Sequence, residues 1–297
     1  MEPIIKEVAV KEIITKTKTP IGGYVANPYT GCLHGCKYCY ASFMKRFTGH
    51  KEPWGSFSDV KYWEPIKNRS KYFNELITIG TVTDGYNPLE EKYLRTRTLL
   101  NELIGSGCKI SILTKSSLVL RDIDLLRQFK DVTISFSINT LDEEFKNDMD
   151  NASSISSRLE AMETLYNEGF KVVCFISPIF PLITDVIKII ERVKNIVDFI
   201  WLENLNLRGD FKSTILDYIV DKYPEYLSTY NEIYKNNNLS YWKELEVNIK
   251  EYIKENNFFY ADNYFSRDKG IKGQPTIINY LFHEEIRGSD NSSKRSK

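Results

Sequence analysis

The 297-residue sequence lacks any long apolar stretch. No run approaches the ~18 consecutive apolar residues that a membrane-spanning helix requires, so we expect no membrane partner. A signal peptide is also missing, because charged residues interrupt the apolar positions of the first 20 residues. These two absences lead us to expect a cytoplasmic protein.

Net charge is lacking as well, since 40 Lys and Arg residues balance 40 Asp and Glu residues. No overall electrostatic field attracts nucleic acid or anionic lipid, so any such binding depends on a local patch. Cysteine is scarce, with five residues in the chain. This odd number, with three cysteines close together, is a poor basis for a disulfide framework and favours a cluster of metal ligands.

Short apolar runs alternate with amphipathic helical windows through the middle of the chain. The runs predict parallel strands covered on both faces, at 76–82, 109–114, 132–138, 171–177 and 199–204, with an earlier strand at 24–27. Repeated strand–helix units imply right-handed crossovers. We therefore predict an α/β fold, namely a partial (β/α)6 TIM-like barrel of parallel strands with a C-terminal helical extension.

Capping residues and glycines mark the expected helices. One helix is expected over 89–104, a second opens at the capping-box sequence that starts at Ser157 and closes at Gly169, and Thr184 or Asp185 caps a third. Beyond Phe211, helical spacing continues in a stretch rich in Tyr, Asn and Lys. The expected divisions are an N-terminal segment 1–20, a barrel core 21–210, a helical extension 211–287 and a disordered tail 288–297.

Three cysteines, Cys32, Cys36 and Cys39, follow the first expected strand in the sequence NPYTGCLHGCKYCY. Their spacing on a Gly-containing loop lets three thiolates converge on one soft metal centre, either zinc or iron–sulfur. A structural zinc site requires four protein ligands, and His34 is a cramped fourth because it lies inside the loop. A [4Fe–4S] cluster held by three cysteines leaves one iron open to a small chelating molecule.

The CxxxCxxC spacing, with an aromatic residue before the third cysteine, resembles the signature of the radical S-adenosylmethionine superfamily. Within it, the chain resembles the spore photoproduct lyase-like (DNA-repair photolyase-like) group over about residues 20–205, in segments such as HGCKYCYASFMKRFTGHKEPWG, TVTDGYNPLEEKYLRTR and FSINT. The resemblance implies an oxygen-sensitive enzyme with a [4Fe–4S] cluster and S-adenosyl-L-methionine. It also implies a reductant such as flavodoxin or ferredoxin, and a 5′-deoxyadenosyl radical that abstracts hydrogen from the substrate.

The resemblance and the barrel rule together suggest site residues, although no catalytic residue is assigned. Cys32, Cys36 and Cys39 are the expected iron ligands. Active sites of such barrels gather at the C-terminal ends of the strands, where polar residues follow apolar runs. The expected cofactor contacts are Tyr38 beside the adenine, Thr83 or Asp84 at the ammonium group, Arg158 at the carboxylate, and Lys115 and Ser137 nearby. A packed loop tyrosine is the alternative for Tyr38, and a strand-end cap or a surface salt bridge for the others.

One position departs from the lyase-like pattern. The resemblance implies a hydrogen-donor cysteine just before the Thr83-Asp84 pair, and Thr81 stands there. A threonine O–H bond is too strong to donate a hydrogen atom readily to a carbon radical. The substrate therefore stays open, with nucleic acid or a nucleotide favoured. The basic and aromatic segment 43–55 could clamp a nucleic-acid strand or cover the site as a lid.

Two further functions remain open at this point. One is a radical enzyme that modifies a peptide or a protein. The other is a non-catalytic, zinc-structured module that binds nucleic acid. A zinc site is colourless and needs a fourth ligand, whereas an iron–sulfur cluster absorbs visible light, so the metal content separates the module from the enzymes.

Overall fold

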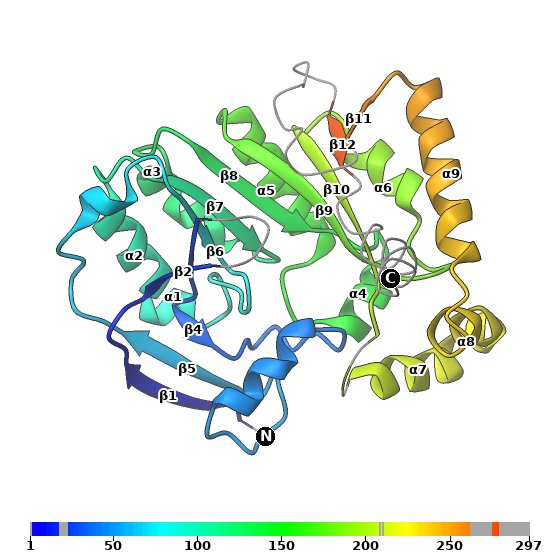
Figure 1. The fold of residues 1–297 in the computed structure, drawn as a ribbon, viewed down its shortest axis with the longest axis horizontal. Helices are drawn as coiled ribbons and strands as arrows, with labels where there is room; N and C mark the ends of the chain where they lie inside the picture. The colour runs from blue at the N-terminus through cyan, green and yellow to red at the C-terminus, as the bar shows by residue number, and fades with distance from the viewer. Residues whose placement is uncertain (1, 18–22, 208, 210, 262–274, 279–297) are drawn as a thin grey trace, which may run out of the picture. The chain divides into compact units, whose positions relative to one another are not determined.

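The computed structural model describes residues 2–17, 23–207, 209, 211–261 and 275–278. It has a mixed α/β fold with a large, mostly parallel sheet and a separate three-stranded sheet (Figure 1). The chain divides into two compact units: unit 1 is Met1–Phe136 with Glu143–Val172, and unit 2 is Ser137–Asp142 with Val173–Lys297. In the part of the chain described, no helix is long and apolar enough to cross a membrane.

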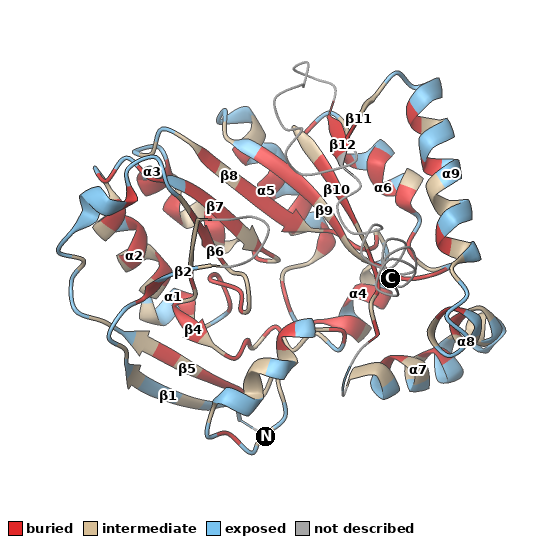
Figure 2. Cartoon of the chain, viewed as in Figure 1, coloured by how far each residue is buried: buried red, intermediate tan, exposed pale blue. Residues whose placement is uncertain are grey.

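Parallel strands form the core of unit 1. They are β3 (Tyr24–Ala26), β6 (Leu76–Ile79), β7 (Lys109–Thr114) and β8 (Val132–Ser137). They pair in the order β8-β7-β6-β3, and the short strand β2 (Ile14–Lys16) joins β3 in antiparallel orientation. Ile77, Ile112 and Ile134 are fully buried, and Figure 2 shows these strands largely in red. The four strands confirm the apolar runs that predicted them.

The helices of unit 1 begin and end at positions that differ from the expected ones. They are α1 (Glu90–Tyr93), α2 (Arg95–Leu103), α3 (Ile123–Leu126), α4 (Glu143–Met149) and α5 (Ile155–Asn167), with 3-10 helices η1 (Tyr40–Phe47), η2 (Arg69–Tyr72) and η3 (Ser117–Asp122). The single helix expected over 89–104 is wrong, because Leu94 has φ +53° and interrupts it. The expected opening of α5 at Ser157 is also wrong, because the hydroxyl of Ser154 caps this helix by accepting the Ser157 N–H.

A second, three-stranded sheet in unit 1 was not predicted. Its strands are β1 (Ile4–Ala9), β4 (Tyr29–Thr30) and β5 (Phe57–Tyr62), in the order β1-β5-β4. Phe57 and Val60 of β5 are fully buried, whereas β1 is mostly exposed. Strand β4 ends two residues before Cys32, so this sheet supports the start of the cysteine-bearing loop.

Unit 2 contains four parallel strands in the order β9-β10-β12-β11. They are β9 (Lys171–Ile179), β10 (Phe199–Asn204), β11 (Phe259–Ala261) and β12 (Thr276–Ile278). Its helices are α6 (Val186–Val193), α7 (Phe211–Lys222), η4 (Pro224–Tyr226), α8 (Leu227–Tyr234) and α9 (Ser240–Glu255). Asp185 caps α6, as predicted.

The C-terminal extension confirms the expected helices and adds to them. Helices α7, α8 and α9 account for its helical spacing, and β11 and β12 add two short strands that the sequence did not predict. The expected disordered tail at 288–297 lies outside the described residues. The domain boundaries expected from the sequence stay predictions.

Candidate functional site

The three cysteines lie on a compact loop between β4 and η1, which we call the cysteine loop (residues 31–39). Turn hydrogen bonds space them, since the Gly35 N–H donates to the Cys32 carbonyl and the Cys39 N–H donates to the Cys36 carbonyl, each at 3.2 Å. A Cβ on Gly55 would lie 2.8 Å from the Cα of Gly35, so the segment after η1 packs directly on this loop. Cys32 is buried, while Cys36 and Cys39 are partly exposed.

The three thiols lie within electrostatic range of one another. Burial raises the pKa of Cys36 well above its usual value, and the charges of Asp150, Cys39 and Cys32 raise it further, against the opposing effect of Lys115. Burial and the neighbouring Cys32 also raise the pKa of Cys39. The raised pKa favours the protonated thiols of Cys36 and Cys39 in the metal-free protein, and binding of a metal centre would release those protons, because thiolates are the metal ligands.

This donor set fits an iron–sulfur cluster. Among the described residues, no group of three or more His, Cys, Asp or Glu side chains could hold a metal ion. In a [4Fe–4S] cluster, by contrast, each cysteine thiolate binds a different iron. Three thiols on one loop, two of them partly exposed, suit a cluster that keeps one iron open.

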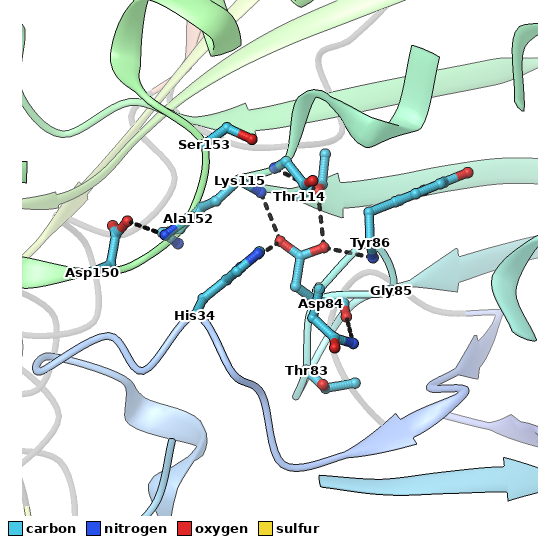
Figure 3. A network of polar contacts seen from close by, with 12 residues as sticks. His34, Thr83, Asp84, Gly85, Tyr86, Thr114, Lys115, Asp150, Ala152 and Ser153 are labelled. Atoms are coloured by element: carbon cyan, nitrogen blue, oxygen red, sulfur yellow. Dashed lines mark hydrogen bonds and ion pairs between the residues drawn. The ribbon is translucent and has the colours of Figure 1, made fainter. Parts of the chain in front are cut away.

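Asp84 connects the cysteine loop to the ends of β6 and β7 (Figure 3). Its Oδ1 accepts hydrogen bonds from the Tyr86 N–H and the Thr114 hydroxyl, each at 2.8 Å. Its Oδ2 accepts from the Lys115 N–H at 2.7 Å and lies 3.3 Å from Nδ1 of His34. Four donors therefore surround one buried carboxylate, and they come from three separate segments of unit 1.

His34 and Asp84 form a buried ion pair. Burial opposes the charged form of His34, but the charges of Cys32 and Asp84 raise its pKa to about 10. Burial likewise opposes ionisation of Asp84, but His34 and two backbone N–H groups hold the pKa of this carboxyl below its usual value. In this structure His34 is thus the cationic partner of Asp84.

Tyr38 and Arg158 meet at the carboxylate of Asp150. The Tyr38 hydroxyl donates to Asp150 Oδ2 at 3.1 Å, and Nη2 of Arg158 donates to Oδ1 at 2.8 Å. Arg158 is fully buried. The carboxylate that this guanidinium binds in the structure is therefore that of Asp150.

The remaining expected contacts are placed as follows. The Thr83 hydroxyl donates to the Gly31 carbonyl at 2.8 Å, which anchors the start of the cysteine loop. The ammonium of Lys115 lies 5.6 Å from the centre of the Tyr38 ring. Ser137 ends β8, is half-buried and belongs to unit 2. Unit 1 thus brings together the three cysteines and five of the six expected cofactor contacts.

The position of the implied hydrogen donor is occupied by a well-bonded threonine. Nδ2 of Asn27 donates to Oγ1 of Thr81 at 3.0 Å, and the Tyr40 hydroxyl donates to the Thr81 carbonyl. Asn27 also accepts the Val82 N–H at 3.2 Å. These bonds join the loop after β6 to Asn27, between β3 and β4, and to Tyr40, at the start of η1. No thiol stands at position 81.

Comparisons with known proteins find relatives of this chain. The chain is 38% identical over 224 residues to an uncharacterized protein of Methanocaldococcus jannaschii, covering 74% of this chain and 84% of that protein. It is 33% identical over 172 residues to an uncharacterized protein of Acidianus two-tailed virus, covering 54% of this chain and 56% of that protein.

Solved structures share the fold. A substituted spore photoproduct lyase with bound AdoMet and dinucleoside spore photoproduct matches with a TM-score of 0.56 and 14% identity, covering 93% of this chain and 82% of that one. The model of the radical SAM superfamily matches residues 26–194, which include the cysteine loop and strands β6 to β9. The chain therefore belongs to the radical S-adenosylmethionine superfamily, whose members are enzymes that use a [4Fe–4S] cluster and S-adenosylmethionine.

Proposed function

We propose that this enzyme assembles its [4Fe–4S] cluster on Cys32, Cys36 and Cys39, with one iron left open for S-adenosylmethionine. When bound, the two groups supply a 5′-deoxyadenosyl radical that abstracts a hydrogen atom from the substrate. The observation that carries this proposal is the cysteine loop, in which three thiols share one electrostatic environment and two are partly exposed. An external reductant such as flavodoxin or ferredoxin supplies the electron, and a reducing cytoplasm suits the free thiols.

The side chains around the loop are proposed to bind S-adenosylmethionine in different ways. Tyr38 presents an aromatic ring and Lys115 an ammonium group, 5.6 Å from the ring centre, that suits the carboxylate or ribose oxygens. Thr83 and Asp84 form the wall for the amino group. The His34 contact at 3.3 Å is the longest of the four at Asp84, so an incoming ammonium group would replace it first.

Arg158 and Ser137, the other two expected cofactor contacts, are proposed on separate grounds. Arg158 is proposed to act on the site indirectly, through Asp150, because its guanidinium is fully buried and hydrogen-bonded to that carboxylate. Ser137 keeps the contact that the family resemblance implies for the serine at the end of β8.

A nucleic-acid strand or a nucleotide is the substrate that we propose. Helix η1, directly after Cys39, exposes Tyr40, Phe43 and Phe47, which are 61%, 44% and 66% accessible. The Arg46 guanidinium lies 5.5 Å from the centre of the Phe43 ring and 4.7 Å from that of Phe47. Exposed aromatic rings interleaved with a cation suit stacked bases and their phosphates. The dinucleoside held by the structurally similar lyase supports the same substrate class.

The cluster is tested by anaerobic reconstitution. We expect about four irons and four sulfides per chain for a [4Fe–4S] cluster, an S = ½ EPR signal after reduction with dithionite, and a change in that signal when S-adenosylmethionine is added. Cys36→Ala should abolish the signal, whereas Cys108→Ala, at a buried thiol at the start of β7, should keep it. Zinc without iron after reconstitution would refute the proposal and favour the non-catalytic, zinc-structured module.

The substrate class is tested by fluorescence anisotropy with a labelled single-stranded oligonucleotide. Phe47→Ala should weaken binding by about 5- to 150-fold, since base–aromatic stacking contributes ~1–3 kcal/mol per base. Phe73→Ala, at a ring that is 67% exposed on the loop after η2, is the matched control and should bind as the wild type does. Equal affinity of both variants would contradict the role of η1.

A further inference from the structure

The connection between α4 and α5, residues 150–154, lies against the cysteine loop. The Asn151 N–H donates to the His34 carbonyl at 2.7 Å, and the Lys37 N–H donates to the carbonyl of Met149, the last residue of α4, at 2.9 Å. In the sequence, these two backbone bonds fall on either side of Cys36. A segment from beyond β8 therefore holds the part of the loop that carries the second cysteine.

Asp150 is the buried side chain at the centre of this contact. Its Oδ2 accepts the Tyr38 hydroxyl at 3.1 Å, and its Oδ1 accepts Nη2 of Arg158 at 2.8 Å and the Ala152 N–H at 3.0 Å. Nζ of Lys146 lies 3.7 Å from the same Oδ1. The Asp150 side chain is 1% exposed, so water cannot take the place of these partners.

Removing the Asp150 carboxylate would destabilise the fold, because buried cations surround it. Arg158 is 0% exposed and Lys146 is 4% exposed, so removing the carboxylate would leave two buried cations with less compensation. Buried ion pairs contribute little net stability compared with apolar residues of the same volume. An apolar residue could fill this space but could not accept a hydrogen bond from the Tyr38 hydroxyl. The buried Asp150–Arg158 pair is therefore best explained by its position against Tyr38.

We propose that Asp150 is a positioning residue of the cofactor site, whose carboxylate fixes the Tyr38 ring and through it the conformation of the cysteine loop around Cys36 and Cys39. Arg158, Lys115 and Lys146 favour the ionised form of this carboxylate inside the protein. The contact of Tyr38 with S-adenosylmethionine rests on the proposed function. The hold of Asp150 on the cysteine loop does not, because it is a property of the metal-free protein.

The first experiment therefore uses the metal-free protein. Full-length chain is alkylated with iodoacetamide, and each cysteine peptide is quantified over time by mass spectrometry. Asp150→Asn should raise the alkylation rates of Cys36 and Cys39 by about tenfold, the effect expected when a hydrogen bond to a charged group no longer opposes local opening. The buried Cys108 and Cys174 report global unfolding in the same sample, and their rates should not change.

A second variant covers the case in which Asp150→Asn unfolds the protein. Tyr38→Phe keeps the ring and every buried charge and removes only the hydroxyl that Asp150 accepts. It should raise the alkylation rates of Cys36 and Cys39 in the same direction. Asp221→Asn, at an exposed position on α7, is the control for loss of a carboxylate and should match the wild type.

The second experiment measures, in the reconstituted protein, whether Asp150 and Tyr38 affect S-adenosylmethionine binding independently. Both Asp150→Asn and Tyr38→Phe should raise the dissociation constant of S-adenosylmethionine, followed through its effect on the EPR signal. If Asp150 acts through Tyr38, the double variant should bind no more weakly than Asp150→Asn alone. A purely structural role of Asp150 would instead make the two losses multiply.

The two proposals fail in distinguishable ways. Wild-type protein that assembles no cluster refutes the proposed function, and the alkylation rates still decide the role of Asp150. The charge of Asp150 itself raises the pKa of Cys36, so Tyr38→Phe, which keeps that charge, is the decisive variant. Unchanged rates at Cys36 and Cys39 in Tyr38→Phe, or losses of affinity that multiply in the double variant, overturn the positioning role. Faster alkylation confined to these two cysteines, together with losses that do not multiply, supports it.

Discussion

Asp84→Asn is expected to lower the free energy of unfolding by about 2–6 kcal/mol, because asparagine cannot accept the four hydrogen bonds that the carboxylate accepts. Oδ1 has two donors, Tyr86 and Thr114, and Oδ2 has two donors, Lys115 and His34. Whichever way the amide turns, its NH2 group faces two donors. Each buried donor left without an acceptor costs ~1–3 kcal/mol, and two of them give the stated range.

The assay is urea unfolding of the metal-free protein, followed by intrinsic fluorescence. The midpoint for Asp84→Asn should fall while the slope with urea stays constant, since the surface exposed on unfolding is unchanged. Asp124→Asn is the matched control, because Asp124 pairs with Arg97 at a position where its side chain is 57% exposed. Its midpoint should stay near that of the wild type. If the two variants unfold at the same midpoint, the four hydrogen bonds at Asp84 do not contribute as described.

Further predictions concern other buried groups. Tyr29→Phe removes the 2.5 Å hydrogen bond to the buried Glu90 carboxylate and should cost ~1.5–3 kcal/mol in urea unfolding; a smaller loss would show that Glu90 is satisfied without it. Gly80→Ala should be much more destabilising than Gly105→Ala, by calorimetry, because both residues have positive φ but only the Cβ at Gly80 would lie 2.3 Å from a carbonyl oxygen of β7. Equal losses would exclude the clash. Burial opposes ionisation of Asp150, but neighbouring cations lower the pKa of this carboxyl below 3.8. The stability that Asp150 contributes is therefore complete above pH 3.8 and is lost as the pH falls through the lowered pKa of the folded state. The gap in melting temperature between wild type and Asp150→Asn should therefore narrow below pH 3.8, and a constant gap would contradict the shift.

The sequence predicts well whatever local patterns encode. The apolar runs at β7 and β10 give both strands with the correct ends, because a run covered on both faces must be apolar throughout. The spacing of Cys32, Cys36 and Cys39 is equally local, since one short loop must deliver all three thiols. These are the parts of the fold and the site that need no information from distant residues.

The parts that the sequence missed depend on side-chain contacts that local patterns do not report. The helix expected over 89–104 breaks because the buried Glu90 side chain accepts the N–H groups of Thr96 and Arg97 and so starts α2 afresh. The role of Asp150 depends on Tyr38, which lies 112 residues earlier in the chain. No periodicity or spacing around either residue reports such a pairing, and only the folded chain brings the two together.

This separation bears on how the protein is made. The cysteine loop leaves the ribosome early. The residues whose hydrogen bonds and ion pairs hold it leave the exit tunnel later; they are Asp84, Lys115 and Asp150. During synthesis the three thiols are therefore exposed on a loop that lacks these contacts, and the complete set of contacts can form only after α5 has emerged. A nascent chain that stalls before α4 would therefore present its thiols to any metal or oxidant within reach.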